Sequence, residues 1–138
     1  MTEKRSYQPF VELLRKAGLR PTRQRLGLAK LLFKEGDRHV TAEILHGEAH
    51  AQRMKVSLAT VYNTLNQFTE AGLLREVMVE PGCSYFDTNR SAHHHFYHEG
   101  NRQLTDIPGD AMQLGALPAV PHGSKVERVD VIIRLKDA

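Results

Sequence analysis

The chain has 138 residues, of which 25% are charged and 41% hydrophobic, with a formal net charge of +3. This length fits one domain or two small ones and is sufficient to bury a hydrophobic core. The single Cys83 excludes an intramolecular disulfide. No apolar run approaches the length of a membrane span or follows a basic signal-peptide start, so we expect a protein of the reducing cytoplasm.

The charge is unevenly distributed along the chain. Residues 1–75 carry 13 Lys plus Arg against 7 Asp plus Glu, a net charge of +6, whereas residues 76–138 carry 6 against 9, a net charge of −3. A basic N-terminal half indicates a polyanionic partner for that half, although many basic proteins bind nothing specific.

Two helices are expected before Gly36. The first is an apolar stripe within residues 8–17, and residues 1–6 before it are polar and expected to be irregular. The second starts at Pro21 and Thr22 and is basic in its first turn. Those basic side chains could hold DNA phosphates, or they could simply form a solvated face. They are Arg20, Arg23 and Arg25.

A third helix is expected from Thr41 to about Gln52, and a fourth from Ser57 to Gly72. Ser57 can cap the fourth helix by accepting a hydrogen bond from an early backbone N–H, and Gly72 can end it in a left-handed turn. Apolar residues at steps of three, four and three predict one buried face for this helix. They are Leu58, Val61, Leu65 and Phe68.

The opposite face of the fourth helix carries amides, hydroxyls and an alanine with almost no charge, which is unusual for a solvated helix. Asn and Gln can pair with adenine, and Ala, Thr and aromatic rings can pack against thymine methyl groups. This face therefore indicates contact with DNA bases, with a plain surface helix as the competing interpretation. The candidates are Ser57, Ala59, Thr60, Tyr62, Asn63 and Asn66.

The segment after the fourth helix predicts a β-hairpin. Residues 74–80 alternate in polarity and end at Pro81-Gly82, a type II turn signal, and residues 84–88 return as a second strand. Three helices followed by a hairpin form a winged helix. We therefore expect an α+β fold that begins with a winged helix-turn-helix DNA-binding domain at 1–88, followed by a polar linker at 89–92.

The C-terminal part is expected to be a small α/β dimerisation domain at 93–138. Strands are predicted at 93–99, 103–107 and 126–135, with a weak helix at 110–114. Their alternating pattern suits a half-buried antiparallel sheet. So few residues would be marginal alone, and we expect this domain to gain burial by pairing with a second copy of the chain.

Three consecutive histidines, His93, His94 and His95, mark the start of this domain. In a strand, His93 and His95 would lie on one face and His94 on the other. Asp87 and His39 are candidates to complete a mixed nitrogen and oxygen ligand set for a divalent transition metal. A polar surface strand is an interpretation of equal weight.

The sequences GLRPTRQR, HVTAEIL, SLATVYNTLNQFTEAGLL and HHHF together resemble the ferric uptake regulator (Fur) family over essentially the whole chain. The combination of VYN, HHHF and a tail ending in VDVIIRL is similar to the Irr subgroup, the iron response regulators of alphaproteobacteria. The resemblance implies a homodimeric transcription regulator, or a higher oligomer. It would act mainly as a repressor of iron and haem genes and not as an enzyme, with Tyr62 in the major groove of a double-stranded operator.

The resemblance also implies two regulatory ligands. Iron, manganese or zinc would be held by His39, Asp87, His93 and His95, and haem by His93, His94 and His95. The family's CxxC pair after the triple His is absent, and Asn63 replaces a frequent Arg, which argues for a different operator. The alternatives are a regulator of another stimulus (zinc, manganese or peroxide), a His-cluster metalloenzyme and a haem carrier.

Overall fold

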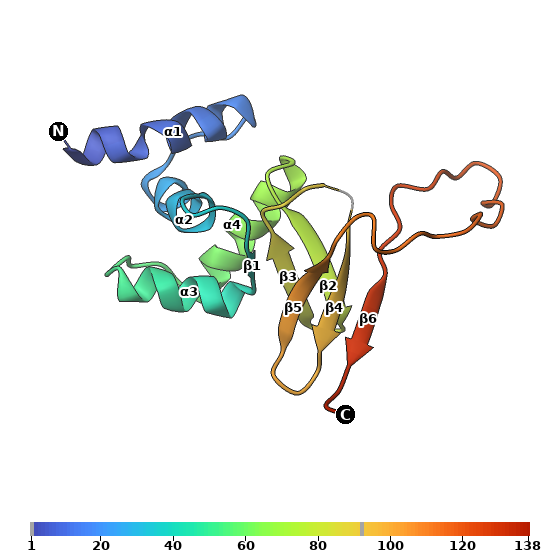
Figure 1. Cartoon of the computed structure of the whole chain (residues 1–138). Helices are drawn as coiled ribbons and strands as arrows, with labels where there is room; N and C mark the ends of the chain where they lie inside the picture. The colour runs from blue at the N-terminus through green and yellow to red at the C-terminus, as the bar shows by residue number, and fades with distance from the viewer. Residues whose placement is uncertain (1, 92) are drawn as a thin grey trace. The chain divides into compact units, whose positions relative to one another are not determined.

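The computed structural model describes residues 2–91 and 93–138, and the chain forms two compact units, Met1–Arg90 and Ser91–Ala138 (Figure 1). The division falls within the segment 89–92 that the sequence marks as a linker, of which residue 92 lies outside the described part. None of the described helices is long and apolar enough to cross a membrane.

The first unit contains four helices and a small sheet. The elements are α1 (Thr2–Lys16), α2 (Arg23–Phe33), β1 (His39–Val40), α3 (Ala42–Ala51), α4 (Leu58–Glu70), β2 (Arg75–Glu80) and β3 (Cys83–Asp87). All four predicted helices are present, but the expectation of irregular structure at residues 1–6 is wrong from Thr2 onward. Glu, Lys and Arg at this end are good helix formers, and Pro9 removes only one hydrogen-bond donor from α1.

Three helices of this unit begin at hydroxyl caps. The side chains of Thr22, Thr41 and Ser57 accept from the backbone N–H three residues later, at 3.3, 3.1 and 3.1 Å. At the other end of α4, Gly72 has a φ of 82°, the left-handed conformation that its sequence position predicts. These local signals fix where α2, α3 and α4 start, and so which residues each presents to the core.

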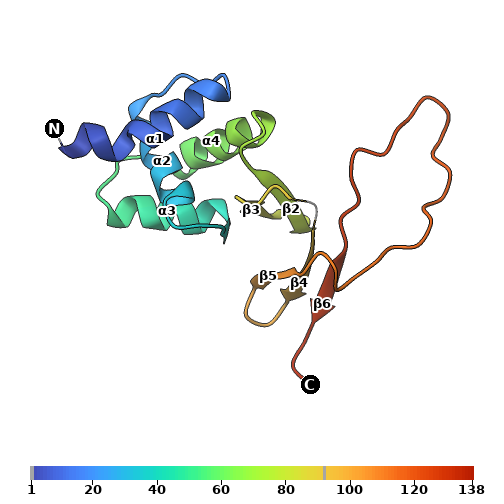
Figure 2. The ribbon, with the colours of Figure 1, turned by 45° about the horizontal axis from the view of Figure 1, so that its top comes forward.

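The core of this unit lies between α1, α2, α3 and α4, which pack against one another in sequence order (Figure 2). The buried residues of α4 are Val61, Thr64, Leu65 and Phe68. Leu58, predicted to be buried, is 36% exposed, and Thr64 is 5% exposed. At about 100° per residue, Leu58 and Thr64 lie on opposite edges of the arc set by the other three, so angular position alone does not decide which is buried, and Leu58 is the first residue of α4.

The sheet of the first unit has the strand order β1-β3-β2, with all pairs antiparallel. The predicted hairpin of β2 and β3 is confirmed, and Gly82 in its turn has a φ of 78°. The two-residue β1, which the sequence does not predict, pairs His39 with Asp87 and Val40 with Phe86. Helices followed by this hairpin form the winged helix expected from the sequence.

The second unit is a three-stranded sheet of β4 (His94–His98), β5 (Gln103–Ile107) and β6 (Ile132–Leu135) in the order β5-β4-β6. β4 and β5 are antiparallel as expected, whereas β6 joins β4 in parallel. The strand predicted at 126–135 is shortened because the partner strand β4 has only five residues with which to pair.

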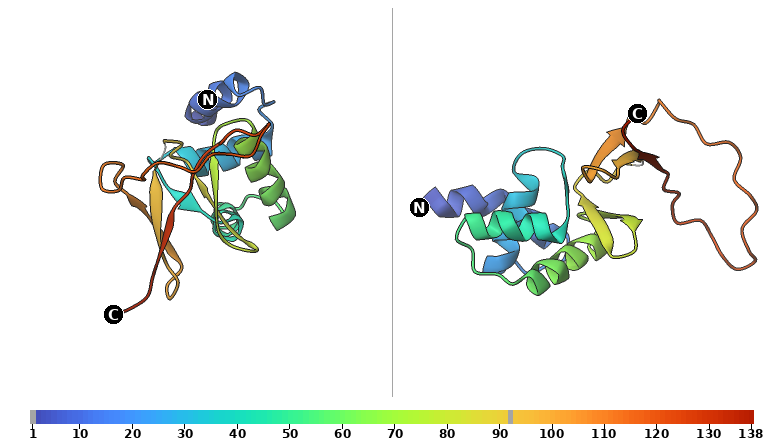
Figure 3. Two further views of the ribbon diagram at one scale, coloured as in Figure 1. Left: turned by 90° about the vertical axis from the view of Figure 1, so that its right-hand side faces the viewer. Right: turned by 90° about the horizontal axis from the view of Figure 1, so that it is seen from below.

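The chain between β5 and β6 is a long loop without regular structure (Figure 3). The helix predicted at 110–114 is therefore wrong. Pro108 and Gly109 precede that segment and Gly115 follows it, and five residues between helix breakers cannot offset the cost of helix nucleation.

Candidate DNA-binding surface and metal-ligating groups

A groove of about 430 Å³ separates the start of α2 from the outer face of α4. It brings together two sets of predicted residues, the cations Arg20 and Arg25 and the polar Thr60 and Asn63 of α4. The remaining lining residues are Thr22, Gln24, Thr64 and Gln67. The groove therefore combines guanidinium groups, which pair with phosphates, and amides, which pair with base edges.

Arg25 is held in place at this groove. One terminal nitrogen donates to Gln67 Oε1 at 3.1 Å and the other donates to the Arg20 carbonyl at 3.0 Å. Because these bonds restrict its rotamers, the guanidinium loses less entropy when it pairs with an anion than a free Arg would.

The other predicted residues of α4 divide by exposure. Ala59 and Asn66 are exposed on its outer face. Ser57 is also exposed, but its hydroxyl accepts from the Thr60 N–H and donates to Thr60 Oγ1 at 2.9 Å, so it serves as the helix cap. The remaining basic candidate, Arg23, lines a different cavity.

Tyr62 lies at the edge of the outer face of α4. Its ring is partly buried against the core, and its hydroxyl donates to Glu43 Oε1 at 3.2 Å. Burial of the ring raises the pKa of Tyr62 above 10.0, and the neighbouring Glu43 carboxylate raises it further. The phenol is therefore neutral at physiological pH and can act as a hydrogen-bond donor.

The C-terminal end of α4 is linked to the end of this unit. Arg90 donates through Nη1 to the carbonyl of Gly72 at 2.6 Å. A cation at this position neutralises part of the negative end of the helix dipole.

Two predicted metal ligands, His39 and Asp87, meet across the ladder of β1 and β3. His39 Nε2 lies 3.1 Å from Asp87 Oδ2, and the Asp87 side chain is 1% exposed. Its other oxygen accepts from the Asn89 N–H at 2.8 Å. A buried carboxylate oriented by a backbone donor and facing an imidazole is a suitable pair of ligands for a divalent cation.

The other two predicted ligands, His93 and His95, meet in the second unit. Their Nε2 atoms lie 3.0 and 3.3 Å from the same atom, Asp106 Oδ1. Their ring centroids are 4.5 Å apart, so the two side chains lie on one face of the strand, as the sequence predicts.

The hydrogen bonds of His93 fix which of its nitrogens can bind a metal. Its Nδ1 lies 2.6 Å from the Ser91 carbonyl, which can only accept, so Nδ1 carries a proton. In the neutral ring, Nε2 then directs a lone pair at the Asp106 carboxylate, and only a proton or a metal cation between them makes that contact favourable. A histidine oriented by a carbonyl is the usual arrangement around protein-bound zinc and related metals, so these donors fit a divalent metal.

His94, on the opposite face, has a different bond. Its Nδ1 accepts from the Val131 N–H at 3.1 Å, so in the neutral ring the proton is on Nε2. Through this hydrogen bond, the His94 ring holds in place the segment that leads into β6. Coordination of a metal or haem by His94 would require this ring to shift its proton or break that bond.

A family model described as the Ferric uptake regulator family matches residues 16–132. The chain belongs to this family. Among curated relatives, the Ferric uptake regulation protein of Shigella flexneri is 40% identical over 81 residues, which are 59% of this chain and 55% of that protein. The protein of Escherichia coli strain K12 is 38% identical over the same shares. The chain thus spans about half the length of these Fur relatives.

Solved structures of Fur proteins show the same fold. The crystal structure of the Vibrio cholerae ferric uptake regulator gives a TM-score of 0.73 at 23% identity, covering 92% of this chain and 98% of that one. The Pseudomonas aeruginosa ferric uptake regulator with manganese gives 0.66 at 22% identity, covering 91% and 96%. At these identities the likeness is one of fold alone.

In this Fur-family chain, Asp106 is a candidate ligand that the sequence alone did not predict. The register of β4 and β5 places it directly opposite His95. Counting that register from the turn at residues 99–102 would have paired the two residues, because opposite positions of an antiparallel ladder share a face.

Proposed function

We propose that the chain is a sequence-specific DNA-binding transcriptional regulator, mainly a repressor, that acts in the cytoplasm as a homodimer on a double-stranded operator. The observation that carries the proposal is the groove in which Asn63 and Thr60 of α4 lie beside Arg20 and Arg25. Groups suited to base edges and groups suited to phosphates are adjacent there, as sequence-specific binding requires. Membership of the Fur family favours a regulator over a His-cluster metalloenzyme.

DNA binding is proposed to depend on a divalent transition metal. The ligands would be His39 and Asp87 from the first unit together with His93 and His95 from the second, joined by Asp106. Support comes from the two convergent groups within the separate units. Family relatives of known structure include proteins with manganese, with iron and with zinc. An ion that takes ligands from both groups would join the two units, which explains how its binding could control operator affinity.

The finer part of the proposal is that the stimulus is iron or haem, as in the Irr subgroup. Its support is the sequence similarity in the triple His, VYN and the C-terminal tail. Haem would use His93, His94 or His95, since imidazole is a common axial ligand. A solved relative is a Campylobacter jejuni peroxide stress regulator, so manganese, zinc and peroxide remain the competing stimuli for this chain.

The decisive experiment is a gel-shift titration with a duplex selected from a random pool by the metal-loaded protein. We expect Asn63→Ala and Tyr62→Ala to weaken binding of the selected duplex by about 1–3 kcal/mol, roughly 5- to 150-fold, with little change on random DNA. Gln113→Ala, which removes an exposed amide from the second unit, is the matched control. Equal discrimination by wild type and Asn63→Ala would refute the role of α4 in contacting bases.

The same titration distinguishes metal from haem as the regulatory ligand when it is repeated with metal-free, metal-loaded and haem-loaded protein. All three must be measured at one salt concentration, because affinity for DNA depends on salt. Metal loading should tighten operator binding and haem should release it. Replacement of His93, His94 and His95 by Ala should abolish the haem response. An unchanged Soret spectrum and release midpoint in that variant would place haem elsewhere.

A further inference from the structure

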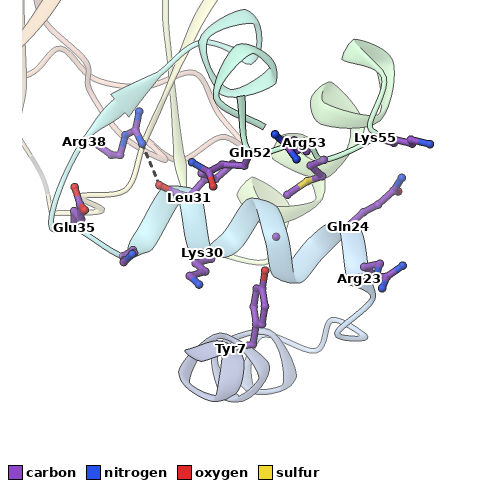
Figure 4. Close-up of a pocket in the computed structure, with 13 residues that line it drawn as sticks. Tyr7, Arg23, Gln24, Lys30, Leu31, Glu35, Arg38, Gln52, Arg53 and Lys55 are labelled. Carbon is purple, nitrogen blue, oxygen red and sulfur yellow. Dashed lines mark hydrogen bonds between the residues drawn. The ribbon is translucent and has the colours of Figure 1, made fainter. Parts of the chain in front are cut away.

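A second and larger cavity also borders α2 and shares the lining residue Gln24 with the groove at α4. It has a volume of about 900 Å³ and is bounded by Tyr7 of α1, by α2, and by the turn that follows α3 (Figure 4). Among its lining residues one carboxylate, Glu35, is outnumbered by cations. These are Arg23, Lys30, Lys34, Arg38, Arg53 and Lys55.

The cations at the two ends of this cavity differ in their partners. Towards the C-terminal end of α2, Arg38 forms an ion pair with Glu48 at 2.6 Å, and Lys30 lies 4.8 Å from the centre of the Tyr7 ring. At the N-terminal end Arg23, Arg53 and Lys55 are exposed, and within residues 2–91 and 93–138 no ion pair is found for them. We call these three residues the basic mouth of the cavity (Figure 4).

Arg53 has a backbone conformation that arginine seldom adopts. Its φ is 60°, in the left-handed region, where the chain leaves α3. The Arg53 N–H donates to the His50 carbonyl at 3.0 Å and the Met54 N–H donates to the Ala49 carbonyl at 2.9 Å, which closes the helix. Glycine is the usual residue at such a position, so an arginine here strains the backbone and places an exposed cation at the end of α3.

The turn that carries Arg53 and Lys55 is anchored between those two residues. Met54 is partly buried against the core, and its terminal methyl occupies the space that a Cβ on Gly27 of α2 would fill. The absence of a side chain at Gly27 therefore allows Met54 to fasten the turn to α2. Its two neighbours line the same cavity as Arg23, which lies at the start of that helix.

The basic mouth is continuous with the surface proposed to contact DNA. Gln24 lines both the cavity and the groove at α4, and Lys55 lies two residues before the cap of α4, Ser57. We propose that Arg23, Arg53 and Lys55 bind phosphates of the operator strand just outside the bases that α4 contacts. This inference rests on the proposed function and adds to it a sequence-independent site.

The opposite end of the cavity is too far away to contribute to the same phosphates. The 11 residues of α2 give a length of roughly 16 Å, which exceeds the screening length of about 8–10 Å in physiological salt. Of the cations that line this cavity, only those of the mouth should therefore bind these phosphates, in addition to Arg20 and Arg25 of the groove at α4.

The test compares an Arg53→Gly/Lys55→Gln double variant with wild type over a range of salt concentrations. Each phosphate that is no longer neutralised should reduce the slope of log K against log salt by about 0.9, so the slope of the double variant should fall by nearly 2 for each bound chain, or by about 3.6 for a homodimer. Affinity should decrease by the same factor on the selected duplex and on random DNA, because phosphates carry no sequence information. Lys125→Gln/Lys136→Gln, which removes two exposed cations of the second unit, is the charge-matched control and should leave the slope unchanged.

Stability gives an independent readout. Arg53→Gly relieves the backbone strain, so on its own it should melt at or above the wild-type temperature while binding DNA more weakly. A lower melting temperature together with weaker binding would mean that Arg53 has only a structural role, and would overturn the proposal. Arg53→Gln, which keeps the strain but removes the charge, should weaken binding to the same extent.

The outcomes separate this inference from the proposed function. Sequence discrimination by wild type together with an unchanged salt slope in the double variant would overturn the phosphate site alone. No discrimination by wild type would overturn the proposed function, while the slope on random DNA would still decide the phosphate site. If millimolar inorganic phosphate raised the wild-type melting temperature and the slope were unchanged, the mouth would hold a free anion, which also contradicts the proposal.

Discussion

The two units of the chain differ in how many apolar side chains they bury. In the first, apolar side chains from all four helices and from the hairpin form one continuous core, in which residues such as Leu65 and Phe68 are fully buried. In the described part of the second, the buried apolar residues are few, namely Tyr97, Leu104 and Ile107. Its long loop also exposes Leu114, Leu117, Val120 and Val126.

This difference shows where each unit must obtain its stability. The first unit gains enough from its own burial to hold α4 rigidly, which the proposed contact with bases would require. A three-stranded sheet with a small core is marginal alone. The second unit is therefore the part that a bound metal or a second copy of the chain would stabilise most.

The largest effect is expected from a cavity in the first unit. Leu65→Ala should lower the free energy of unfolding by about 2–5 kcal/mol, because Leu65 is fully buried at the centre of α4. Leu117→Ala, at a residue that is 51% exposed, should change it by less than about 0.5 kcal/mol. Urea unfolding of the metal-free protein measures both. Similar losses from the two variants would show that the units do not differ as described.

A smaller effect is expected from the proposed metal site, to which the second unit contributes His93, His95 and Asp106. An ion at a hundred times its dissociation constant should stabilise wild type by about 2.7 kcal/mol. His95→Ala should lose most of that gain, because it removes one of the two imidazoles that face Asp106. His98→Ala is the control, since its Nε2 lies 3.0 Å from Asp137 instead. Thermal unfolding with manganese or zinc, with and without a chelator, measures the effect. An equal gain in the His95 variant would exclude it as a ligand.

The smallest effect is expected at alkaline pH and belongs to the first unit. The pKa of Tyr62 is raised above 10.0, first by burial and then by Glu43. From about pH 10 upward, the unfolded phenol ionises while the folded one remains protonated, so folding loses stability as pH rises towards the folded pKa. Tyr62→Phe should show a shallower decline than wild type, with or without metal. Parallel curves of unfolding free energy against pH would show that Tyr62 does not contribute.

Local sequence signals predicted the first unit well. The hydroxyl caps, the apolar spacing of α4 and the Pro81-Gly82 turn each act within a few residues, so the helices and the hairpin follow from neighbours in the chain. The second unit was predicted less completely from such local signals. The extent of β6 depends on the length of β4, and its parallel direction depends on how the chain returns to β4. That partner is more than 30 residues away, so no local pattern records either feature.

The candidate metal ligands also differ in whether a local pattern was sufficient to predict them. Alternation along one strand was sufficient to place His93 and His95 on one face. Asp106 was missed because its place opposite His95 depends on strand register. The cations Arg53 and Lys55 were missed because the conformation that exposes them, a left-handed arginine beside a methionine seated on Gly27, becomes evident only in three dimensions.

The bond from Arg90 to the Gly72 carbonyl has a mechanical consequence. The bond ties Arg90, the last residue of the first unit, to the turn that ends α4. A force on the chain after Arg90 would therefore act on the C-terminal end of α4 before it reached Asn63 or Thr60, and without this guanidinium the end of the unit could move independently of the helix.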